Sequence, residues 1–259
     1  MMFVDRLFLA RLGPEYMPAA MSGGLTTFLC MTFFVGLITF GNALVAQNFG
    51  ADRRDQCAKV TTQALLLALV AYPVVLALIP VGRALCGLAG EGHAQVPLAR
   101  QYYTILTCAT IVVFVRMGFD DFFAGIGRTT VIMTANLVAM LVNIGANYVL
   151  IFGKFGFPAL GIRGAALGTA LGGLVSMLIV SASYFSSTNR RLYFSKGMWK
   201  PDREILGTLI RYGTPAGIEF MLNVAAFHFV VHMMHSYGPE TAAAVTITFS
   251  WDLMAFIPL

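Results

Sequence analysis

The stretch YMPAAMSGGLTTFLCMTFFVGLITFGNALVAQNFGA, residues 16–51, contains no Asp, Glu, Lys or Arg. A helix needs about 20 consecutive apolar residues to cross the hydrocarbon core of a bilayer, so this stretch is long enough to span a membrane. A seventh apolar run begins at residue 242 and reaches the end of the chain at residue 259. The pattern predicts an all-α integral membrane protein, a polytopic helical bundle. Five more stretches of spanning length with few or no charges occupy residues 60–82, 101–123, 129–153, 164–189 and 212–239.

The composition excludes several other classes of protein. The chain is 58% hydrophobic and 11% charged, whereas an average soluble domain has about 25% charged residues. The apolar runs recur along the whole length, so they are not a removable targeting signal. The four cysteines are scattered without a CxxC pair, so we expect neither disulfides nor a metal site. A GxxxxGK[ST] loop, an HExxH motif and a Ser/His/Asp constellation are all missing from the sequence, which disfavours ATP-driven transport and a membrane enzyme.

The basic residues predict how the bundle is oriented. The joints between spans alternate between two sides, and the cytoplasmic side of a membrane protein is the one richer in Lys and Arg. One side has only Arg6, Arg11, Arg83, Arg100, Lys154 and Arg163. The net charge of +5 therefore reflects membrane topology, and no nucleic-acid partner is implied. The richer, cytoplasmic side holds Arg53, Arg54, Lys59, Arg116, Arg128, Arg190, Arg191, Lys196, Lys200, Arg203 and Arg211.

The longest of the cytoplasmic joints, residues 186–213, contains a further element. Pro201-Asp202-Arg203-Glu204 is typical of a helix start, and apolar residues follow it on one side. We expect a short helix here that lies on the membrane surface.

A short motif occurs twice. Gly13-Pro14-Glu15 recurs 225 residues later as Gly238-Pro239-Glu240, and a span precedes and follows each copy. Six spans lie between the two turns, so both turns belong on the same side of the membrane. This predicts a parallel repeat, with two lobes related by an axis along the membrane normal. Because Met1–Leu9 reads as the end of a helix and the second copy stops after about two helices, we expect a chain that is truncated at both ends.

Several stretches along the chain resemble the multidrug and toxin extrusion (MATE) transporters, in the order and spacing of that family. The resemblance implies a fold of twelve helices in two six-helix lobes, and a function in exporting drugs or metabolites against an inward flow of H⁺ or Na⁺. The matching stretches are Val4-Asp5-Arg6-Leu7-Phe8, Arg11–Glu15, Leu44–Ala51, Phe122–Thr129, Asn143-Ile144, Asn147–Gly153, Gly161–Ala170, Gly213-Thr214-Pro215 and Phe256-Ile257-Pro258.

By this resemblance, residues 1–185 form the first lobe without most of its first helix, 186–213 the cytoplasmic connection, and 214–259 the start of the second lobe. The implied function is secondary active efflux of a small organic, cationic substrate by H⁺ or Na⁺ antiport across the bacterial cytoplasmic (inner) membrane. The coupling ion takes the place of a cofactor, and membrane lipid is the other partner. Two alternatives stay open: a lipid-linked oligosaccharide flippase of the same superfamily, which favours an Arg-lined cleft, and a non-transporting truncated membrane subunit. The oligomeric state is not predicted.

An ionisable side chain within a bilayer costs about 2.5–3.5 kcal/mol on insertion scales, so it needs a functional or structural reason. Asp5 matches the acid that many MATE transporters use to bind the coupling cation. Asn143 and Asn147 lie four residues apart and therefore on one face of a span, and Thr169 on the next span can add a hydroxyl. Some family members carry an Asp at the position of Asn147. This chain lacks that second acid, which leaves Asp5 as the main proton carrier. Bonding between helices is the structural alternative for the amides.

The sequence also singles out three groups of polar residues and one group of glycines. Glu219 and Asn223 lie on one face of span 212–239 and, with Asp252, are candidates for the substrate cleft. Arg116, Asp120 and Asp121 are expected to form a structural ion pair. Gly164, Gly168 and Gly172 predict close packing of span 164–189 against another helix. The spacing of His228, His232 and His235 suits a proton relay, with a soft metal site or simple packing as alternatives.

Overall fold

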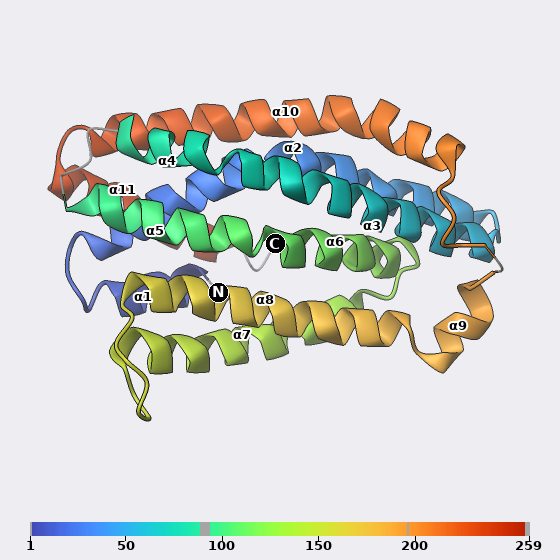
Figure 1. The fold of residues 1–259 in the computed structure, drawn as a ribbon, viewed down its shortest axis with the longest axis horizontal. Helices are drawn as coiled ribbons and strands as arrows, with labels where there is room; N and C mark the ends of the chain where they lie inside the picture. The colour runs from blue at the N-terminus through green and yellow to red at the C-terminus, as the bar shows by residue number, and fades with distance from the viewer. Residues whose placement is uncertain (1, 89–93, 196, 257–259) are drawn as a thin grey trace.

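The computed structural model describes residues 2–88, 94–195 and 197–256, which form eleven α-helices. Most of the helices run along the long axis of one elongated bundle (Figure 1). In chain order they are α1 (Met2–Leu9), α2 (Tyr16–Gly50), α3 (Arg54–Ala77), α4 (Ile79–Leu88), α5 (Gln95–Cys108), α6 (Thr110–Gly125), α7 (Thr129–Phe152), α8 (Ile162–Tyr184), α9 (Ser187–Tyr193), α10 (Arg203–His235) and α11 (Pro239–Phe256).

The expected membrane spans are confirmed within the described ranges. Five helices, α2, α3, α7, α8 and α10, are long and apolar enough to cross a membrane, and α5 with α6, bent by 47°, makes a sixth when the pair is counted as one span. Each of the six apolar runs coincides with one of these spans. The seventh run falls in α11, apart from residues 257–259, which lie outside the described part. The protein is therefore an all-α integral membrane protein.

Two spans are interrupted where the sequence predicted continuous helices. The span expected around residues 101–123 bends at Ala109, where the Tyr72 hydroxyl donates a hydrogen bond to the Cys108 carbonyl (3.0 Å). Tyr72 satisfies a carbonyl at the break, and helices bend where a side chain enters their hydrogen-bond ladder. The span expected over residues 60–82 also ends early, at Ala77, and α4 begins two residues later. Glu91 and His93, in the segment that follows, lie outside the described residues.

The prediction of a short surface helix after Pro201 was wrong. Residues 203–235 form one continuous helix, α10, which includes Pro215. The start was located correctly, because the Asp202 carboxylate caps the helix by accepting from the backbone N–H groups of Glu204 (3.0 Å) and Ile205 (3.2 Å). The segment does not lie apart on a surface, because α10 packs along α2 and Leu209 is fully buried.

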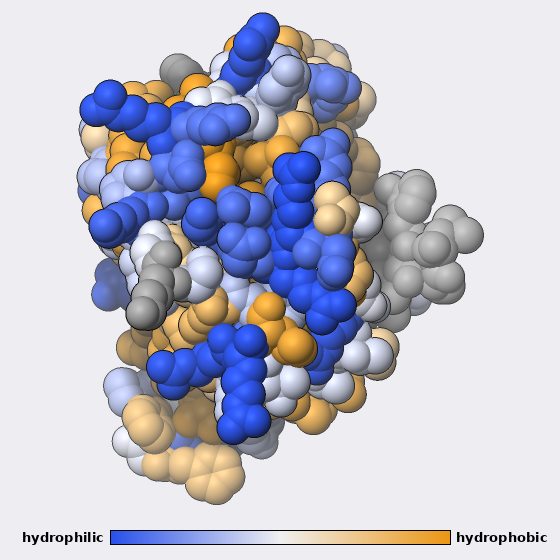
Figure 2. All heavy atoms as spheres, turned by 90° about the vertical axis from the view of Figure 1, so that its right-hand side faces the viewer, coloured by the Kyte–Doolittle hydropathy of each residue, from blue (hydrophilic) through white to orange (hydrophobic). Residues whose placement is uncertain are grey.

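The joints between helices gather alternately at the two ends of the bundle (Figure 1). The α2–α3, α6–α7 and α8–α9 joints lie at one end, which we call the basic end because it carries the predicted cytoplasmic arginines and lysines. Hydrophilic residues cover much of this end in Figure 2. Both Gly-Pro-Glu turns lie at the opposite end, between α1 and α2 and between α10 and α11. The division into lobes at residues 185 and 213 stays a prediction.

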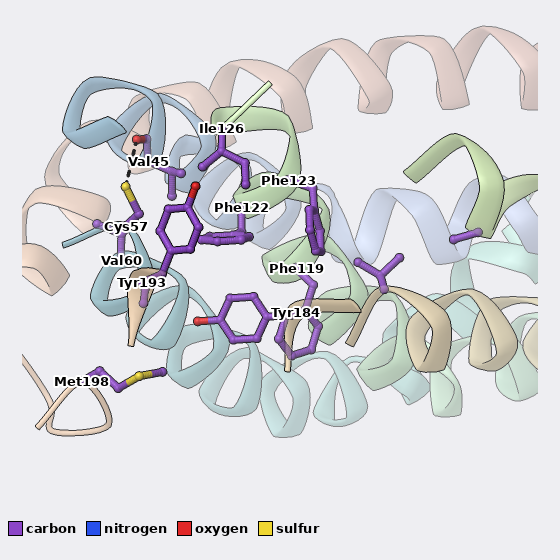
Figure 3. Packing of buried hydrophobic residues seen from close by; sticks show 13 residues of the cluster. Val45, Cys57, Val60, Phe119, Phe122, Phe123, Ile126, Tyr184, Tyr193 and Met198 are labelled. Carbon is purple, nitrogen blue, oxygen red and sulfur yellow. Dashed lines mark hydrogen bonds between the residues drawn. The ribbon is translucent and has the colours of Figure 1, made fainter. Parts of the chain in front are cut away.

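Aromatic side chains from several helices pack together at the basic end. Phe119, Phe122, Tyr184 and Tyr193 lie in one buried cluster with Met198, which follows α9 in the connection to α10 (Figure 3). The ring centroids of Phe122 and Tyr184 are 4.8 Å apart in an edge-to-face arrangement, the geometry that aromatic pairs prefer. The connection is therefore packed against α3, α6 and α8.

A glycine contact brings α10 close to α2. A Cβ atom on Gly36 of α2 would lie 2.5 Å from the Cα atom of Gly217 on α10, closer than any real Cβ contact. A Cβ on Gly217 would lie equally close, 2.5 Å, to the carbonyl oxygen of Phe33. Small residues let helix backbones approach in this way within membranes. The position of α10 on the bundle thus depends on the absence of side chains at this crossing.

Candidate cation-coupling site

The carboxyl group of Asp5 is the centre of a buried polar site formed by three helices. Asp5 lies on α1 and is 2% exposed. Asn147 on α7 donates a hydrogen bond from Nδ2 to one carboxylate oxygen, and the Thr169 hydroxyl on α8 donates to the other at 2.8 Å. The site therefore holds Asp5 between the facing surfaces of α7 and α8.

Asn143 is the fourth residue of the Asp5 site. With its amide oriented so that Nδ2 faces Asp5, it donates to the Oδ1 atom at 3.0 Å, and its own oxygen accepts from the Thr169 backbone N–H at 3.3 Å. In the opposite orientation, Nδ2 faces the Thr169 hydroxyl at 3.4 Å. Asn143 and Asn147 are both fully buried, and their spacing of four residues places them on the same face of α7. The structure thus brings together all four residues for which the sequence predicted a coupling role.

Glycines on α8 allow the close approach that the site requires. A Cβ on Gly168 would lie 2.1 Å from the Oδ1 atom of Asn147, and a Cβ on Gly164 would lie 2.6 Å from the carbonyl carbon of Leu150. The predicted small-residue face of α8 is therefore packed directly on α7. Gly168 in particular leaves the space that the Asn147 amide occupies.

The chemistry of the site suits a proton or a small hard cation. Its potential ligands are oxygen atoms from a carboxylate, amides and a hydroxyl, the donor types that hard cations prefer. The Oδ1 atom of Asn147 is buried without a hydrogen-bond partner among the described residues. A buried amide oxygen without a donor is costly. It faces Gly168 while Nδ2 faces Asp5, and turning the amide over would bring the oxygen to Asp5 as a cation ligand.

Two of the three cleft candidates lie next to each other on α10. Glu219 and Asn223 on α10 are exposed, and the Asn223 amide donates to the Glu219 carbonyl at 3.0 Å. The side chain of Asp252 lies outside the described residues. A groove of about 470 Å³ does lie between α2 and α10, but it is lined by Val35, Gly36, Thr39, Phe40, Asn42, Ala43, Ala216 and Phe220.

Two of the three histidines form a buried pair near the end of α10. The Nε2 atoms of His228 and His232 are 3.0 Å apart, and the His228 Nε2 also lies 3.0 Å from the hydroxyl oxygen of Thr26 on α2. The side chain of His235 lies outside the described residues. The residues that the structure describes contain no group of three or more His, Cys, Asp or Glu placed to hold a metal ion.

The expected ion pair on α6 is present. Arg116 Nε lies 3.0 Å from Asp120 Oδ2, and Arg116 also donates to Asn136 Oδ1 on α7 at 2.8 Å. Asp121 is different, because it is 8% exposed and its Oδ2 atom has no hydrogen-bond partner within the described ranges. The structural interpretation therefore fits Arg116 and Asp120, while Asp121 is a separate buried acid.

Sequence reasoning missed several polar residues that the structure places at key positions. Thr39 and Asn42 line the groove, Thr26 contacts His228, and the buried Gln63 bonds to the connection that precedes α10. The only available signal was their polarity within otherwise apolar runs. That signal marks a residue as unusual but does not say which neighbour it meets.

The sequence profile of the MatE family matches residues 1–149 of the chain. The chain belongs to the MatE family. Its curated relatives include the probable multidrug resistance protein NorM of Neisseria meningitidis serogroup A, 25% identical over 261 residues, which cover 96% of this chain and 54% of the relative. The probable multidrug resistance protein YoeA of Bacillus subtilis is 29% identical over 222 residues, with 84% and 48% covered. The chain thus spans about half the length of the curated relatives it matches.

Solved transporter structures share the fold. An inward-facing multidrug resistance MATE family transporter of the MOP superfamily superimposes with a TM-score of 0.85 at 22% identity, covering 99% of this chain and 58% of that one. A MOP superfamily transporter from Pyrococcus furiosus gives a TM-score of 0.81 at 22% identity, with 97% and 55% covered. At this level of identity the likeness establishes the MATE fold, and the membrane-protein prediction from the apolar runs agrees with it.

Proposed function

We propose that this chain is part of a secondary active exporter that couples the efflux of a small organic molecule to the inward flow of H⁺ or Na⁺ across the cytoplasmic membrane. The single observation that carries the proposal is the buried Asp5 carboxyl, surrounded by Asn143, Asn147 and Thr169. Burying an ionisable carboxyl group in a membrane protein costs free energy. The three neighbouring residues have oxygen atoms that can bind a cation in place of their present hydrogen bonds. The names of the curated relatives support multidrug export as the activity.

Coupling follows from the helices that the site joins. When Asp5 is ionised, its two oxygens accept hydrogen bonds from both α7 and α8. A proton on either oxygen, or a cation between Asp5 and the amide oxygens, changes which of these bonds can form. Ion binding therefore alters how α1 is held against α7 and α8. Such a bistable contact can bias the bundle between two arrangements.

The groove between α2 and α10 is our candidate for part of the substrate pathway. Its lining combines the Phe40 and Phe220 rings with the polar side chains of Thr39 and Asn42. Aromatic and apolar walls with a few polar groups are typical of small-molecule sites. None of the lining residues is basic, which favours an organic cation over the anionic substrate of a flippase.

The test uses the protein at its native length, reconstituted into proteoliposomes, with ethidium as the organic cation. We expect an imposed H⁺ or Na⁺ gradient to drive ethidium transport, and Asp5→Asn to reduce it to the background of protein-free vesicles. The amide keeps the shape of the side chain but can neither take up a proton nor balance a cation. Imposing the H⁺ gradient without Na⁺, and the Na⁺ gradient without a pH difference, identifies the coupling ion.

Asp55→Asn is the matched control, because Asp55 is an exposed acid in the first turn of α3. It should transport ethidium like the wild-type protein. Gradient-driven transport that survives in Asp5→Asn would exclude the proposed coupling role. A wild-type protein that inserts correctly but moves no ethidium would favour the flippase or the non-transporting subunit instead.

A further inference from the structure

The buried acid Asp121 lies apart from the Asp5 site, near the basic end of the bundle. It is on α6, one turn before that helix ends at Gly125, and its side chain is 8% exposed. A Cβ atom placed on Gly41 of α2 would lie 3.7 Å from the Asp121 Oδ2 atom and 3.7 Å from the Cβ atom of Ala64 on α3. The carboxyl group is therefore enclosed where α2, α3 and α6 meet.

No partner within the described ranges offsets a negative charge on Asp121. Its Oδ2 atom is buried without a hydrogen-bond partner, and the ion pairs found in these ranges are Arg54–Asp52 and Arg116–Asp120. The charge that acts on Asp121 is the negative charge of neighbouring Asp120, which repels a second carboxylate. An isolated carboxylate buried away from water is so costly that such a group keeps a proton instead.

The helices packed against α6 bring no free cation to Asp121. Neither α2 nor α7 contains an Asp, Glu, Lys or Arg. On α3, Lys59 is half-buried and forms no ion pair with Asp121 in the described part of the chain. The other titratable groups near this end are Asp55, Cys57 and Tyr184, acids that add no positive charge, and Arg54 and Arg128, which bond to Asp52 and Asn189.

The α2 segment next to Asp121 also lines the groove between α2 and α10. Gly41 faces Asp121, while Thr39, Phe40 and Asn42 line the groove. An ionised Asp121 needs hydrogen-bond donors that the present packing does not supply, and water can supply them when α2 moves away from α6. A protonated Asp121 is compatible with the packing as it stands. Proton binding and the packing of α2 on α6 therefore favour each other.

We propose that Asp121 is a second proton-binding site, which holds its proton while α2 is packed on α6 and releases it when α2 moves away. The ligand is a proton that exchanges with the predicted cytoplasmic side, one helical turn away. A low pH on that side stabilises the packed position of α2, and a rising pH loosens it. The site is independent of Asp5, and only its link to the groove rests on the proposed function.

The first experiment records infrared spectra of the native-length protein in lipid nanodiscs during a pH titration. A protonated carboxyl group has a C=O stretching band that an ionised one lacks. An ordinary Asp is ionised at about pH 7, so a band at that pH that is missing from Asp121→Asn belongs to Asp121. We expect this loss. Asp55→Asn is the matched control, because it removes an exposed acid and should leave the band unchanged.

Two substitutions of Gly41 test the surroundings of the acid without altering it. Serine would place a hydroxyl donor beside the Asp121 Oδ2 atom, which lies 3.7 Å from the Cβ position, and alanine would add the same Cβ without a donor. A hydrogen bond to the ionised form favours that form. Gly41→Ser should therefore make the band disappear at a pH about one unit lower, and Gly41→Ala should not lower that pH.

Cys57 is a native reporter of the packing of α2. Its thiol is fully buried and lies 3.6 Å from the Val45 carbonyl of α2 (Figure 3). Its alkylation by N-ethylmaleimide, located by mass spectrometry, is compared between the wild type and Asp121→Asn at the same pH, which cancels the ionisation of the thiol itself. Because only the wild type can ionise as α2 moves away, the ratio of its rate to that of Asp121→Asn should rise with pH, by up to about tenfold per pH unit.

Asp5→Asn should retain both the Asp121 band and this rise, so failure of the coupling site and failure of this proposal are distinguishable. The proposal is overturned if Asp121→Asn removes no protonated-carboxyl band at about pH 7. It is also overturned if the ratio of alkylation rates does not change with pH.

Discussion

Gly168 determines how closely α8 can approach the amide of Asn147. Its Cβ position lies 2.1 Å from the Asn147 Oδ1 atom, so the hydrogen bond from Asn147 to Asp5 exists only because residue 168 has no side chain. In an exposed helix, replacing Gly by Ala stabilises the backbone by about 0.5–1 kcal/mol. At position 168 the steric conflict outweighs that gain, and its main effect is to displace the Asn147 amide in the Asp5 site.

We therefore expect Gly168→Ala to weaken coupling without preventing membrane insertion. The methyl group displaces the Asn147 amide and removes one of the bonds that orient Asp5. Loss of such an orienting partner typically costs about 10- to 100-fold in ion affinity. Gradient-driven ethidium transport as a function of the driving ion measures this shift. Gly145→Ala on α7 is the control, since nothing lies within 4 Å of its Cβ position, and identical behaviour of the two variants would contradict the assigned packing.

The residues of the Asp5 site could be named from the sequence, but several others could not. The spacing of Asn143 and Asn147 placed them on one face, the family resemblance supplied Asp5, and Thr169 was chosen for its hydroxyl on the next span. Thr26 gave no comparable signal, because a threonine in an apolar helix most often bonds to its own backbone, as Thr26 also does. Only the three-dimensional packing of α2 against α10 reveals that its oxygen also lies 3.0 Å from the His228 Nε2 atom.

The positions of the helices were predictable from the lengths of the uncharged runs, whereas their interruptions were not. The bend at Ala109 contains neither proline nor glycine, and its hydrogen bond comes from Tyr72 on another helix. Conversely, Pro215 lies inside the continuous α10. Local sequence therefore located each spanning segment, but contacts between helices decide where a segment breaks.

Gln63 on α3 holds the connection that leads into α10. Its side chain is fully buried, donates from Nε2 to the Lys200 carbonyl at 3.0 Å and accepts from the Asp202 backbone N–H at 3.1 Å. A single side chain thus satisfies the backbone on both sides of Pro201. Because Asp202 is also the N-cap of α10, Gln63 fixes the point at which that helix begins.

Gln63→Leu should detach this connection from α3. The leucine removes both hydrogen bonds, which are part-buried, at a cost of about 1 kcal/mol for each. We expect a lower melting temperature in detergent and faster proteolytic cleavage within residues 194–202. Gln56→Leu on the same helix is the control, because the Gln56 amide bonds only to the exposed Asp55 carboxylate (3.1 Å) among the contacts described. Unchanged cleavage in Gln63→Leu would show that packing of Met198 alone holds the connection.

The two ends of the bundle differ in charge, and this asymmetry should orient the whole molecule. The α2–α3, α6–α7 and α8–α9 joints share the basic end, while the α7–α8 loop lies at the other end (Figure 1). Positively charged loops resist translocation across the bacterial inner membrane. The energetic preference is therefore for the basic end, which includes Arg53, Arg128 and Arg191, to remain in the cytoplasm.

An epitope inserted between Gly156 and Phe157, in the α7–α8 loop, should be accessible to antibody in intact spheroplasts. The same epitope inserted between Asp52 and Arg53, in the exposed α2–α3 joint, should become accessible only after the membrane is permeabilised. Both insertions lie outside the long helices, so neither should disturb the bundle. The opposite pattern would place the His228–His232 pair on the cytoplasmic side. It would also mean that the basic joints do not set the orientation of the bundle.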